Sequence, residues 1–276
     1  MIKKFHLKKI LNFGEEICQT EDVVAIEEPL EINLKSTDDT IFPVSVTMRT
    51  PGNDEELALG FLFTEGILFS KLNIDENSIS KMGFNWISIH LNNNLHPNID
   101  KLKRNFYTTS SCGVCGKESI EAIHQTRKTP SKVSEIEVDL KTIFSLPEKL
   151  YEVQKTFQTT GGIHAAAFFD SLGNLIEYRE DVGRHNALDK LIGAEFLKSN
   201  SEDFFIQDKI LLLSGRASFE LLQKAAMANI IIVCAIGAPS SLAIETAENF
   251  GITLIGFLKN GSCNIYTNDY RVKNLS

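Results

Sequence analysis

The chain has 276 residues, of which 43% are hydrophobic and 23% are charged, as in a globular protein with a substantial core. Its formal net charge of −8 argues against broad binding to nucleic acid or to membrane surfaces, which requires a basic face. The basic N-terminus lacks the apolar segment of a signal peptide, and the longest apolar stretch, residues 230–238, is too short to span a membrane. These features predict a cytoplasmic protein with no nucleic-acid partner and no membrane attachment.

Three of the five cysteines, Cys18, Cys234 and Cys263, stand far from any other cysteine in the sequence. This spacing does not form a disulfide framework, and it favours a reducing compartment such as the cytoplasm. We expect these three residues to be buried or incidental thiols, because an unpaired cysteine behaves as a small hydrophobic residue.

The N-terminal part of the chain predicts an arm at residues 1–19 and a smaller α+β domain at residues 20–108. Residues 42–48 and 86–91 have the composition and alternation of strands. Between them, the spacing of apolar residues predicts a helix with Asp54 as its N-cap.

Residues 109–276 predict a larger α/β domain. Residues 164–169 and 175–179 flank a Gly-Asn turn and predict a β-hairpin, and residues 186–198 predict a helix.

Three short apolar runs follow, at residues 210–213, 230–235 and 253–258. They alternate with a predicted helix at residues 218–228 and with another that begins at Ser240 or Ser241. Apolar strands that alternate with helices are typical of a sheet covered on both faces. The sequence therefore predicts an α/β fold with a mixed, largely parallel sheet in a three-layer arrangement.

Each of these three strands is followed by a loop of small and polar residues, at 214–218, 237–241 and 259–262. Ligands of open α/β sheets bind beyond the carboxyl ends of the strands, where helix N-termini attract anions. Arg216 can bind a phosphate through two hydrogen bonds, and Lys259 would act as a point charge. The alternative is that the serines and glycines only cap helices and turn the chain. Three such loops on one sheet edge favour an anionic, nucleotide-like ligand.

A Cys112-Gly113-Val114-Cys115-Gly116 loop is the sharpest local motif, and helix-like sequence follows it from Glu118. A helix N-terminus and the adjacent Lys117 lower the pKa of a thiol and favour the thiolate, which attacks sulfur or binds a metal.

Three interpretations of this loop compete. A thioredoxin-like redox site is expected in a βαβ context near the N-terminus, which is not the setting here. A zinc site would take Cys112, Cys115 and His164 as ligands, but zinc deaminases carry a glutamate two residues after the histidine, where this chain has Ala166. The third interpretation is a sulfur carrier, and the local residues leave all three open.

Taken together, the motifs resemble the FdhD family, the sulfurtransferases that formate dehydrogenase requires. The resemblance covers most of the chain. It is carried by the strings Arg49-Thr50-Pro51-Gly52, Ser111-Cys112-Gly113-Val114-Cys115-Gly116, Thr160-Gly161-Gly162-Ile163-His164, Glu180-Asp181-Val182-Gly183-Arg184-His185-Asn186, Ser214-Gly215-Arg216 and Ala238-Pro239-Ser240-Ser241.

The resemblance implies that a cysteine desulfurase loads sulfur onto the loop, with Cys112 as the persulfide carrier and Cys115 as an accessory thiol. The sulfur then passes to the Mo-bis(molybdopterin guanine dinucleotide) cofactor, which is a bound substrate, before the cofactor enters formate dehydrogenase. The resemblance further implies a cytidine deaminase-like fold, a homodimer, and neither a permanent cofactor nor a resident metal.

The resemblance also places contacts to the molybdenum cofactor on one stretch, which is less rich in arginine here than in the family pattern: Phe257, Leu258, Lys259, Asn260, Gly261 and Ser262. We expect further contacts at the other strand ends and motif strings: Ser214, Gly215, Arg216, Ser240, Arg184, His185 and His164. The alternative for Arg184 is that it pins its loop together with Asp181, and the alternative for His164 is a structural hydrogen bond. Two other functions remain open: a zinc-dependent deaminase-like hydrolase, and a cofactor chaperone that never carries sulfur.

Overall fold

The computed structural model of the protein describes residues 1–11, 16–81, 83–92, 121, 123–124, 126–129 and 134–274. Cys112 and Cys115 lie outside the described residues, so the predictions about their loop stay predictions.

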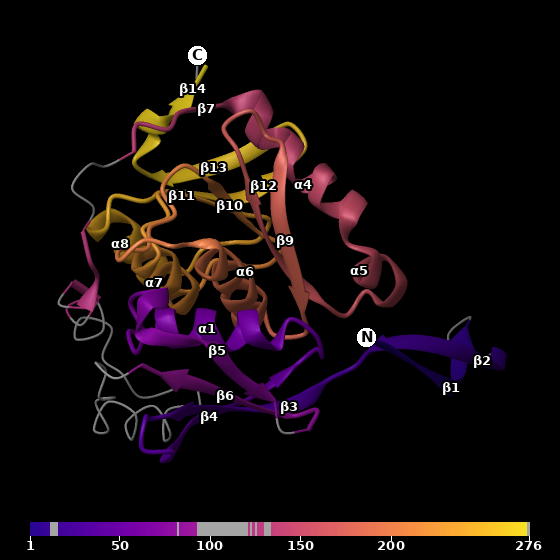
Figure 1. Cartoon of the computed structure of the whole chain (residues 1–276). Helices are drawn as coiled ribbons and strands as arrows, with labels where there is room; N and C mark the ends of the chain where they lie inside the picture. Colours follow the sequence, from indigo (N-terminus) through magenta and orange to yellow (C-terminus); the bar gives the residue numbers. More distant parts are fainter. Residues whose placement is uncertain are drawn as a thin grey trace.

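A six-stranded sheet forms the centre of the molecule, with the strand order β13-β12-β11-β10-β8-β9 (Figure 1). Its strands are β8 (His164–Phe169), β9 (Leu175–Asp181), β10 (Ile210–Leu213), β11 (Ile232–Ala235), β12 (Thr253–Lys259) and β13 (Ser262–Thr267). Only the β10–β11 and β11–β12 pairings are parallel, whereas β8–β9, β8–β10 and β12–β13 are antiparallel. The sheet is mixed as expected, but the prediction that it is largely parallel is wrong. The reason is that two tight hairpins add antiparallel strands at its two sides.

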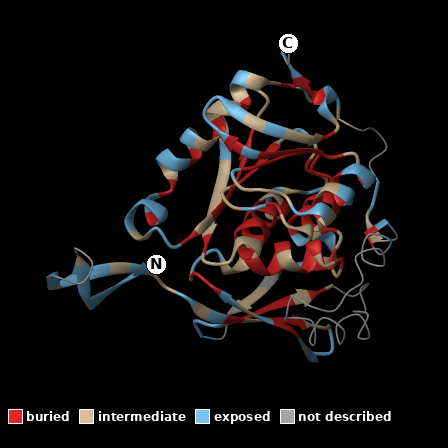
Figure 2. Cartoon of the chain, turned by 180° about the vertical axis from the view of Figure 1, so that it is seen from behind, coloured by how far each residue is buried: buried red, intermediate tan, exposed pale blue. Residues whose placement is uncertain are grey.

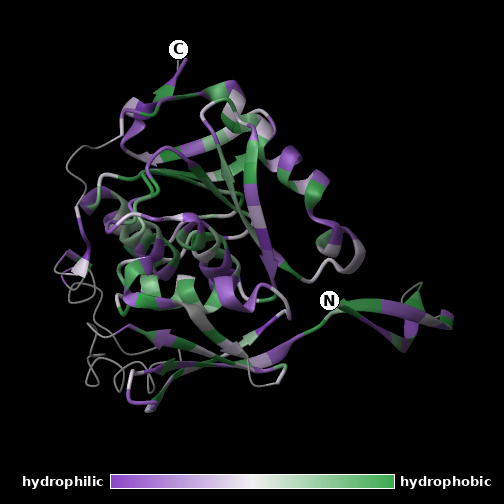
Figure 3. Cartoon of the chain, in the orientation of Figure 1, coloured by the Kyte–Doolittle hydropathy of each residue, from purple (hydrophilic) through white to green (hydrophobic). Residues whose placement is uncertain are grey.

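Helices cover both faces of this sheet and make the predicted three layers. One face is covered by α6 (Arg184–Lys198), α7 (Phe219–Met227) and α8 (Ser241–Asn249). The other is covered by α4 (Leu140–Val153), beside α5 (Lys155–Thr160) and the short pair of β7 (Val138–Asp139) and β14 (Val272–Lys273). Side chains alternate between the two layers: Phe168 packs toward α6 and Phe169 toward α4, and both are fully buried. Strands β10 to β12 are hydrophobic along most of their length because both faces are covered (Figures 2 and 3).

A second, four-stranded sheet with the order β4-β3-β6-β5 lies beyond the α6 layer. Its elements are β3 (Glu28–Lys35), β4 (Ile41–Arg49), α1 (Asp54–Thr64), the 3-10 turn η2 (Lys71–Asn73), β5 (Ile74–Lys81) and β6 (Trp86–Leu91). Helix α1 fills the space between this sheet and α6, and a side chain at Gly60 would come within 1.8 Å of the Asp189 carbonyl oxygen. One hydrophobic core runs from Ile32 in the small sheet to Leu254 in the large one. The division of the chain near residue 108 therefore stays a prediction.

The N-terminal segment is a two-stranded hairpin of β1 (Ile2–Leu11) and β2 (Glu16–Ala25) that projects from the body (Figure 1). The predicted arm at residues 1–19 contains β1, and the hairpin continues to Ala25. Ile10 and Ile17 pair near its tip and are 65% and 64% exposed.

Several predicted boundaries differ from the observed ones. Asp54 is not the N-cap of α1, because Asn53 in the left-handed conformation precedes the helix and the Asp54 carboxylate instead accepts a hydrogen bond from Arg49 Nε at 2.9 Å. Helix α6 begins at Arg184, two residues before its predicted start, and β11 begins at Ile232. Within the described part of the chain, none of the helices combines the length and apolar character that crossing a membrane requires.

Candidate functional site at the carboxyl edge of the large sheet

The three loops predicted from the strand ends lie side by side at one edge of the six-stranded sheet. Gly237 N–H donates to the Gly215 carbonyl at 2.9 Å, and Phe257 N–H donates to the Gly237 carbonyl at 3.1 Å. A side chain at Gly237 would come within 2.9 Å of the Arg216 backbone nitrogen, so glycine permits this close approach. The structure therefore brings together the loops after β10, β11 and β12.

Two of the three predicted serines, Ser214 and Ser240, have structural hydrogen bonds. Ser214 Oγ accepts a hydrogen bond from Ala165 N–H at 2.8 Å, which ties the loop after β10 to β8. Ser240 Oγ accepts one from Ala243 N–H at 3.2 Å and is the N-cap of α8. A tie to β8 and a helix cap thus account for Ser214 and Ser240, and their contact with a ligand stays a prediction.

The stretch after β12 divides into three parts. Phe257 lies in a β-bulge with a left-handed φ of 51° and is 49% exposed, so its ring faces solvent. Leu258 is only 1% exposed and its side chain packs in the core against the α4 layer, so contact of Leu258 with the molybdenum cofactor stays a prediction. Residues 259–262 form an exposed hairpin turn in which Gly261 has a φ of 78°, a backbone conformation that favours glycine.

Arg184, Arg216 and Lys259 share one property at this edge. None of the three forms an ion pair or a side-chain hydrogen bond with any residue that the structure describes. By contrast, Arg179 Nη2 donates to Glu56 at 2.7 Å. Unpaired guanidinium and ammonium groups next to exposed loop backbone are suited to binding phosphate.

His164 and Arg184 open neighbouring elements, β8 and α6. A side chain at Gly215 would come within 3.3 Å of His164 Nδ1, so this imidazole lies directly against the loop after β10. Burial, and then the charge of Arg184, lower the pKa of His164 below its ordinary value. The structure therefore places His164 and Arg184 at the same edge as the strand-end loops.

His185 follows Arg184 and points toward α7. Its Nε2 is buried without a hydrogen-bond partner among the described residues, and it lies 4.0 Å from Glu220 Oε2. Burial, with the positive charges of Lys224 and Arg184, lowers the pKa of His185 to about 4. The imidazole is therefore neutral at physiological pH.

Asp181 holds the loop that presents Arg184. Its Oδ1 accepts hydrogen bonds from Gly183 N–H at 2.9 Å and from Asn186 Nδ2 at 3.1 Å. Its Oδ2 accepts one from Thr50 N–H at 3.1 Å and lies 2.7 Å from Lys190 Nζ. Asp181 thus pins the loop as one alternative predicted, but Arg184 takes no part in that network.

The contacts of Asp181 with Thr50 and Lys190 were not predicted from the motifs. Both residues could have been suspected because two motif strings carry the family resemblance: Arg49-Thr50-Pro51-Gly52 and Glu180 to Asn186. In the structure, hydrogen bonds join these two strings into one unit.

A second buried charge cluster lies at the centre of α6. Lys224 Nζ from α7 lies 3.0 Å from both Asp189 and Glu65, and Thr64 donates to Asp189 at 2.8 Å. Burial raises the pKa of Asp189 to about 6. Burial alone would lower the pKa of Lys224, but the two carboxylates hold it above its ordinary value. All the charges of this cluster are paired, so it serves the packing of α1, α6 and α7.

The opposite edge of the sheet anchors the chain that follows the cysteine loop in sequence. The His124 ring stacks on Phe250 with a centroid distance of 4.3 Å, and Arg127 Nε donates to Asn229 Oδ1 at 2.8 Å. Asn229 Nδ2 in turn donates to the Lys128 carbonyl at 3.1 Å. Phe250 and Asn229 precede β12 and β11, so this anchor lies at the amino edge.

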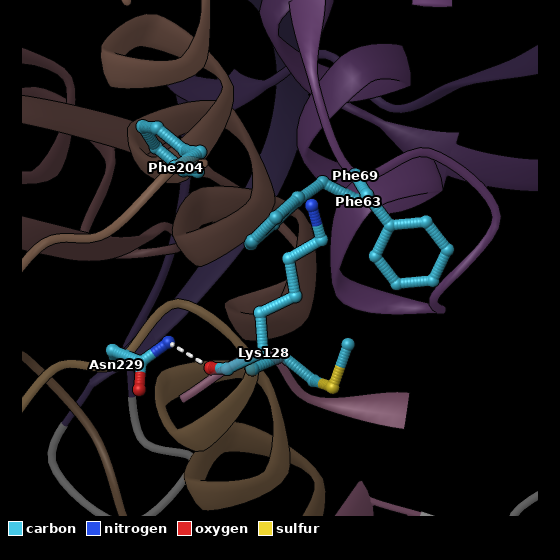
Figure 4. A pocket seen from close by; sticks show the side chains of 6 residues that line it. Phe63, Phe69, Lys128, Phe204 and Asn229 are labelled. Atoms are coloured by element: carbon cyan, nitrogen blue, oxygen red, sulfur yellow. Dashed lines mark hydrogen bonds between the residues drawn. The ribbon is translucent and has the colours of Figure 1, made fainter. Parts of the chain in front are cut away.

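A small cavity beside this anchor is too narrow for a cofactor. Its volume of about 10 Å³ is near that of one water-sized sphere. Figure 4 shows its lining, which consists of Phe63, Phe69, Lys128, Phe204, Met227 and Asn229.

The remaining cysteines agree with their predicted roles. Cys18, Cys234 and Cys263 are free thiols, and burial raises the pKa of Cys234 well above its ordinary value. Among the described residues no group of three or more His, Cys, Asp or Glu side chains is arranged to hold a metal. The zinc interpretation depends on Cys112 and Cys115 and stays open.

The sequence matches the FdhD/NarQ family over residues 25–273. It is 46% identical over 270 residues to the sulfur carrier protein FdhD of Picrophilus torridus, covering 96% of this chain and 97% of that protein. It is 41% identical over 269 residues to the protein of the same name from Mycobacterium bovis, covering 94% and 95%. The fold is similar to that of a proposed formate dehydrogenase accessory protein from Desulfotalea psychrophila, with a TM-score of 0.73, 22% identity and coverage of 98% and 99%.

Proposed function

Because this chain belongs to the FdhD/NarQ family, we propose that it is a sulfur carrier in the maturation of formate dehydrogenase. In this proposal a cysteine desulfurase supplies the sulfur, and the Mo-bis(molybdopterin guanine dinucleotide) cofactor receives it as a bound substrate. The observation that carries the proposal is the family match from residue 25 to residue 273, which spans the Cys112–Cys115 motif.

The carboxyl edge of the large sheet is the proposed binding site for the guanine dinucleotide. Arg184, Arg216 and Lys259 would hold its phosphates, since none forms an ion pair or a side-chain hydrogen bond with a described residue. The exposed ring of Phe257 offers a flat surface on which a base can stack. The chemistry at the metal belongs to the molybdenum cofactor, and the protein orients it.

The loading step needs one thiolate. The Cys112 thiolate attacks the terminal sulfur of the desulfurase persulfide, a new S–S bond forms on Cys112, and the desulfurase cysteine leaves as a thiolate. One S–S bond is made and one is broken, so no external oxidant or reductant is required. A reducing cytoplasm, which we propose as the location, keeps Cys112 available for this exchange. We also propose that the protein acts as a homodimer.

Intact-mass spectrometry tests the loading step. We expect the protein, after incubation with a cysteine desulfurase and cysteine, to gain sulfur that dithiothreitol removes. Cys112→Ala should abolish the gain, because it removes the attacking thiolate. Cys263→Ala is the matched control and should load as the unmodified protein does, since this partly buried thiol lies in β13.

The same Cys112→Ala variant separates the two alternatives. A variant that still supports formate dehydrogenase activity would indicate a chaperone that carries no sulfur. Stoichiometric zinc that is lost in the variant would indicate the deaminase-like hydrolase, because the motif would then be a metal site.

A further inference from the structure

The N-terminal hairpin of β1 and β2 takes no part in the proposed sulfur transfer. It projects from the body (Figure 1), and every residue of its two strands is exposed or half-buried. The family match begins at residue 25, where β2 ends. A two-stranded hairpin without further packing is at best marginally stable in water. This hairpin nevertheless exposes several large apolar side chains, as interaction surfaces do: Ile2, Phe5, Ile10, Ile17 and Val24.

The register of the hairpin divides its side chains between two faces. Successive side chains of a strand point to opposite faces, and residues paired across the two strands share a face. Each pair on one of these faces joins an apolar side chain to a polar one, so apolar surface runs along its whole length. This face, called the Phe5 face, comprises the following pairs from the base to the tip: Lys3 with Val24, Phe5 with Asp22, Leu7 with Thr20, Lys9 with Cys18, and Leu11 with Glu16.

We propose that two copies of this chain pack their N-terminal hairpins together through the Phe5 face, antiparallel and about a twofold axis at Leu7. This inference rests on the proposed homodimer, and it adds where the two copies meet. The antiparallel arrangement places the two bodies at opposite ends of the paired hairpins. It therefore avoids a clash between the bodies, each of which is much wider than the hairpin (Figure 1). A twofold contact uses the same surface on both copies.

The charges of the Phe5 face are complementary to themselves in this arrangement. Leu7 is the middle residue of this face on β1, so the pair nearer the base on one copy meets the pair nearer the tip on the other. Phe5 and Asp22 of one copy therefore face Lys9 of the partner subunit. The Asp22 carboxylate attracts this ammonium group, and the Phe5 ring adds a cation–π contact. Twofold symmetry forms the contact twice.

The other face of the hairpin lacks this complementarity. Its middle residue on β1 is His6, so the same antiparallel packing would set Lys4 of one copy against Lys8 of the partner subunit. Like charges that face each other across an interface are unfavourable. In addition, Lys4 Nζ lies 3.5 Å from Glu21 Oε2 of its own hairpin, so this cation already has a partner. The charge pattern therefore selects the Phe5 face.

Analytical ultracentrifugation of charge-reversal variants tests the proposed interface. Asp22→Lys and Lys9→Asp should each raise the dissociation constant of the dimer about 10- to 100-fold, because each replaces two attractive contacts with repulsive ones. The combination of both should return the dissociation constant close to that of the unmodified protein. Lys9 pairs with Cys18, which is four residues and about 14 Å from Asp22 along β2, so this rescue cannot arise within one hairpin.

The adjacent lysine supplies the matched control. Lys8→Asp makes the same change of charge on the other face and should leave the dissociation constant unchanged. A cross-link locates the twofold axis: Leu7→Cys in a Cys18→Ser background should form a covalent dimer with a short bismaleimide. Lys8→Cys in the same background should form none, because it points away from the interface.

Three results would overturn the inference in different ways. A dimer that none of these variants weakens would leave the proposed homodimer standing and remove the hairpin as its interface. A protein that is monomeric at every concentration would remove the homodimer and the hairpin contact together, whereas the sulfur-loading test would be unaffected. Weakening by Lys8→Asp but not by Lys9→Asp would contradict the choice of face. If a charge-reversal variant does not fold, the cross-link at residue 7 decides, and its absence contradicts the inference.

Discussion

Charged side chains are paired along helix α6 but unpaired at the carboxyl edge of the large sheet. Along α6 every buried charge is paired: Asp181 with Lys190 at 2.7 Å, and Asp189 with Lys224 at 3.0 Å. At the sheet edge Arg184 and Arg216 have no such partner among the described residues. Unpaired buried charge is costly, so the pairs on α6 maintain the fold. The unpaired cations at the edge remain available for an anionic ligand.

The largest loss in the free energy of unfolding is expected where a buried ion pair is broken. Asp181→Ala leaves Lys190 buried and uncompensated, and it removes four hydrogen bonds or contacts of the carboxylate. We expect a loss of about 3–5 kcal/mol in the free energy of unfolding, measured by urea denaturation.

A double variant sharpens this result. Asp181→Ala combined with Lys190→Met removes both charges, so it should recover part of the lost stability. A single variant that loses less than about 1 kcal/mol would contradict the view that the pair maintains the fold.

The opposite pattern is expected at the sheet edge. Arg216→Ala removes an exposed cation without an ion pair among the described residues, so its free energy of unfolding should stay within about 0.5 kcal/mol. Its affinity for guanosine diphosphate should fall about 10- to 100-fold, since a hydrogen bond between charged groups contributes about 1.5–3 kcal/mol.

A cation elsewhere on the surface supplies the control. Lys141→Ala alters an exposed residue of α4 and should affect neither quantity. If Arg216→Ala unfolds the protein, or leaves its affinity for guanosine diphosphate unchanged, then the cations at the sheet edge do not differ from the paired charges of α6 in the way described.

The same contrast explains which parts of the structure the sequence could predict. Strands β10 to β12 follow from unbroken apolar runs, and the three loops follow from the small and polar residues after them. Strand β13, with the sequence SCNIYT, has no such run and was missed, and its antiparallel pairing made the sheet less parallel than expected. Leu258 was assigned to the ligand because it lies within the motif, although strand alternation turns its side chain into the core.

The buried pairs were beyond the reach of sequence patterns. Thr50 and Asp181 are 131 positions apart, and only the packing of α1 on α6 brings their neighbourhoods together. Local periodicity reports which face of an element is buried, but it does not report which distant polar group meets it. For the same reason the separation of Arg184 from the Asp181 network was not foreseen.

The smallest expected effect is a pH dependence of stability that belongs to His185. Its pKa is about 4 in the folded protein, against an ordinary value of 6.5, so the unfolded chain binds more protons between these values. The contribution is therefore complete above pH 6.5 and is lost as the pH falls toward 4. The shift alone would correspond to about 3 kcal/mol, and we expect about 1–2 kcal/mol because the side chain is 36% exposed.

The contribution of His185 has to be measured as a difference between the unmodified protein and a variant, because Asp189 also contributes to the pH dependence of stability. Its raised pKa of about 6 has the opposite sign, because the folded protein then binds more protons and loses stability as the pH rises through this range. The two contributions partly cancel in the unmodified protein, but His185→Asn removes only one of them. The stability of the unmodified protein minus that of His185→Asn should decrease as the pH is lowered from 6.5 to 4. A difference that does not change with pH would mean that the imidazole at the start of α6 is hydrated, and it would remove the contrast between this site and the ordinary surface.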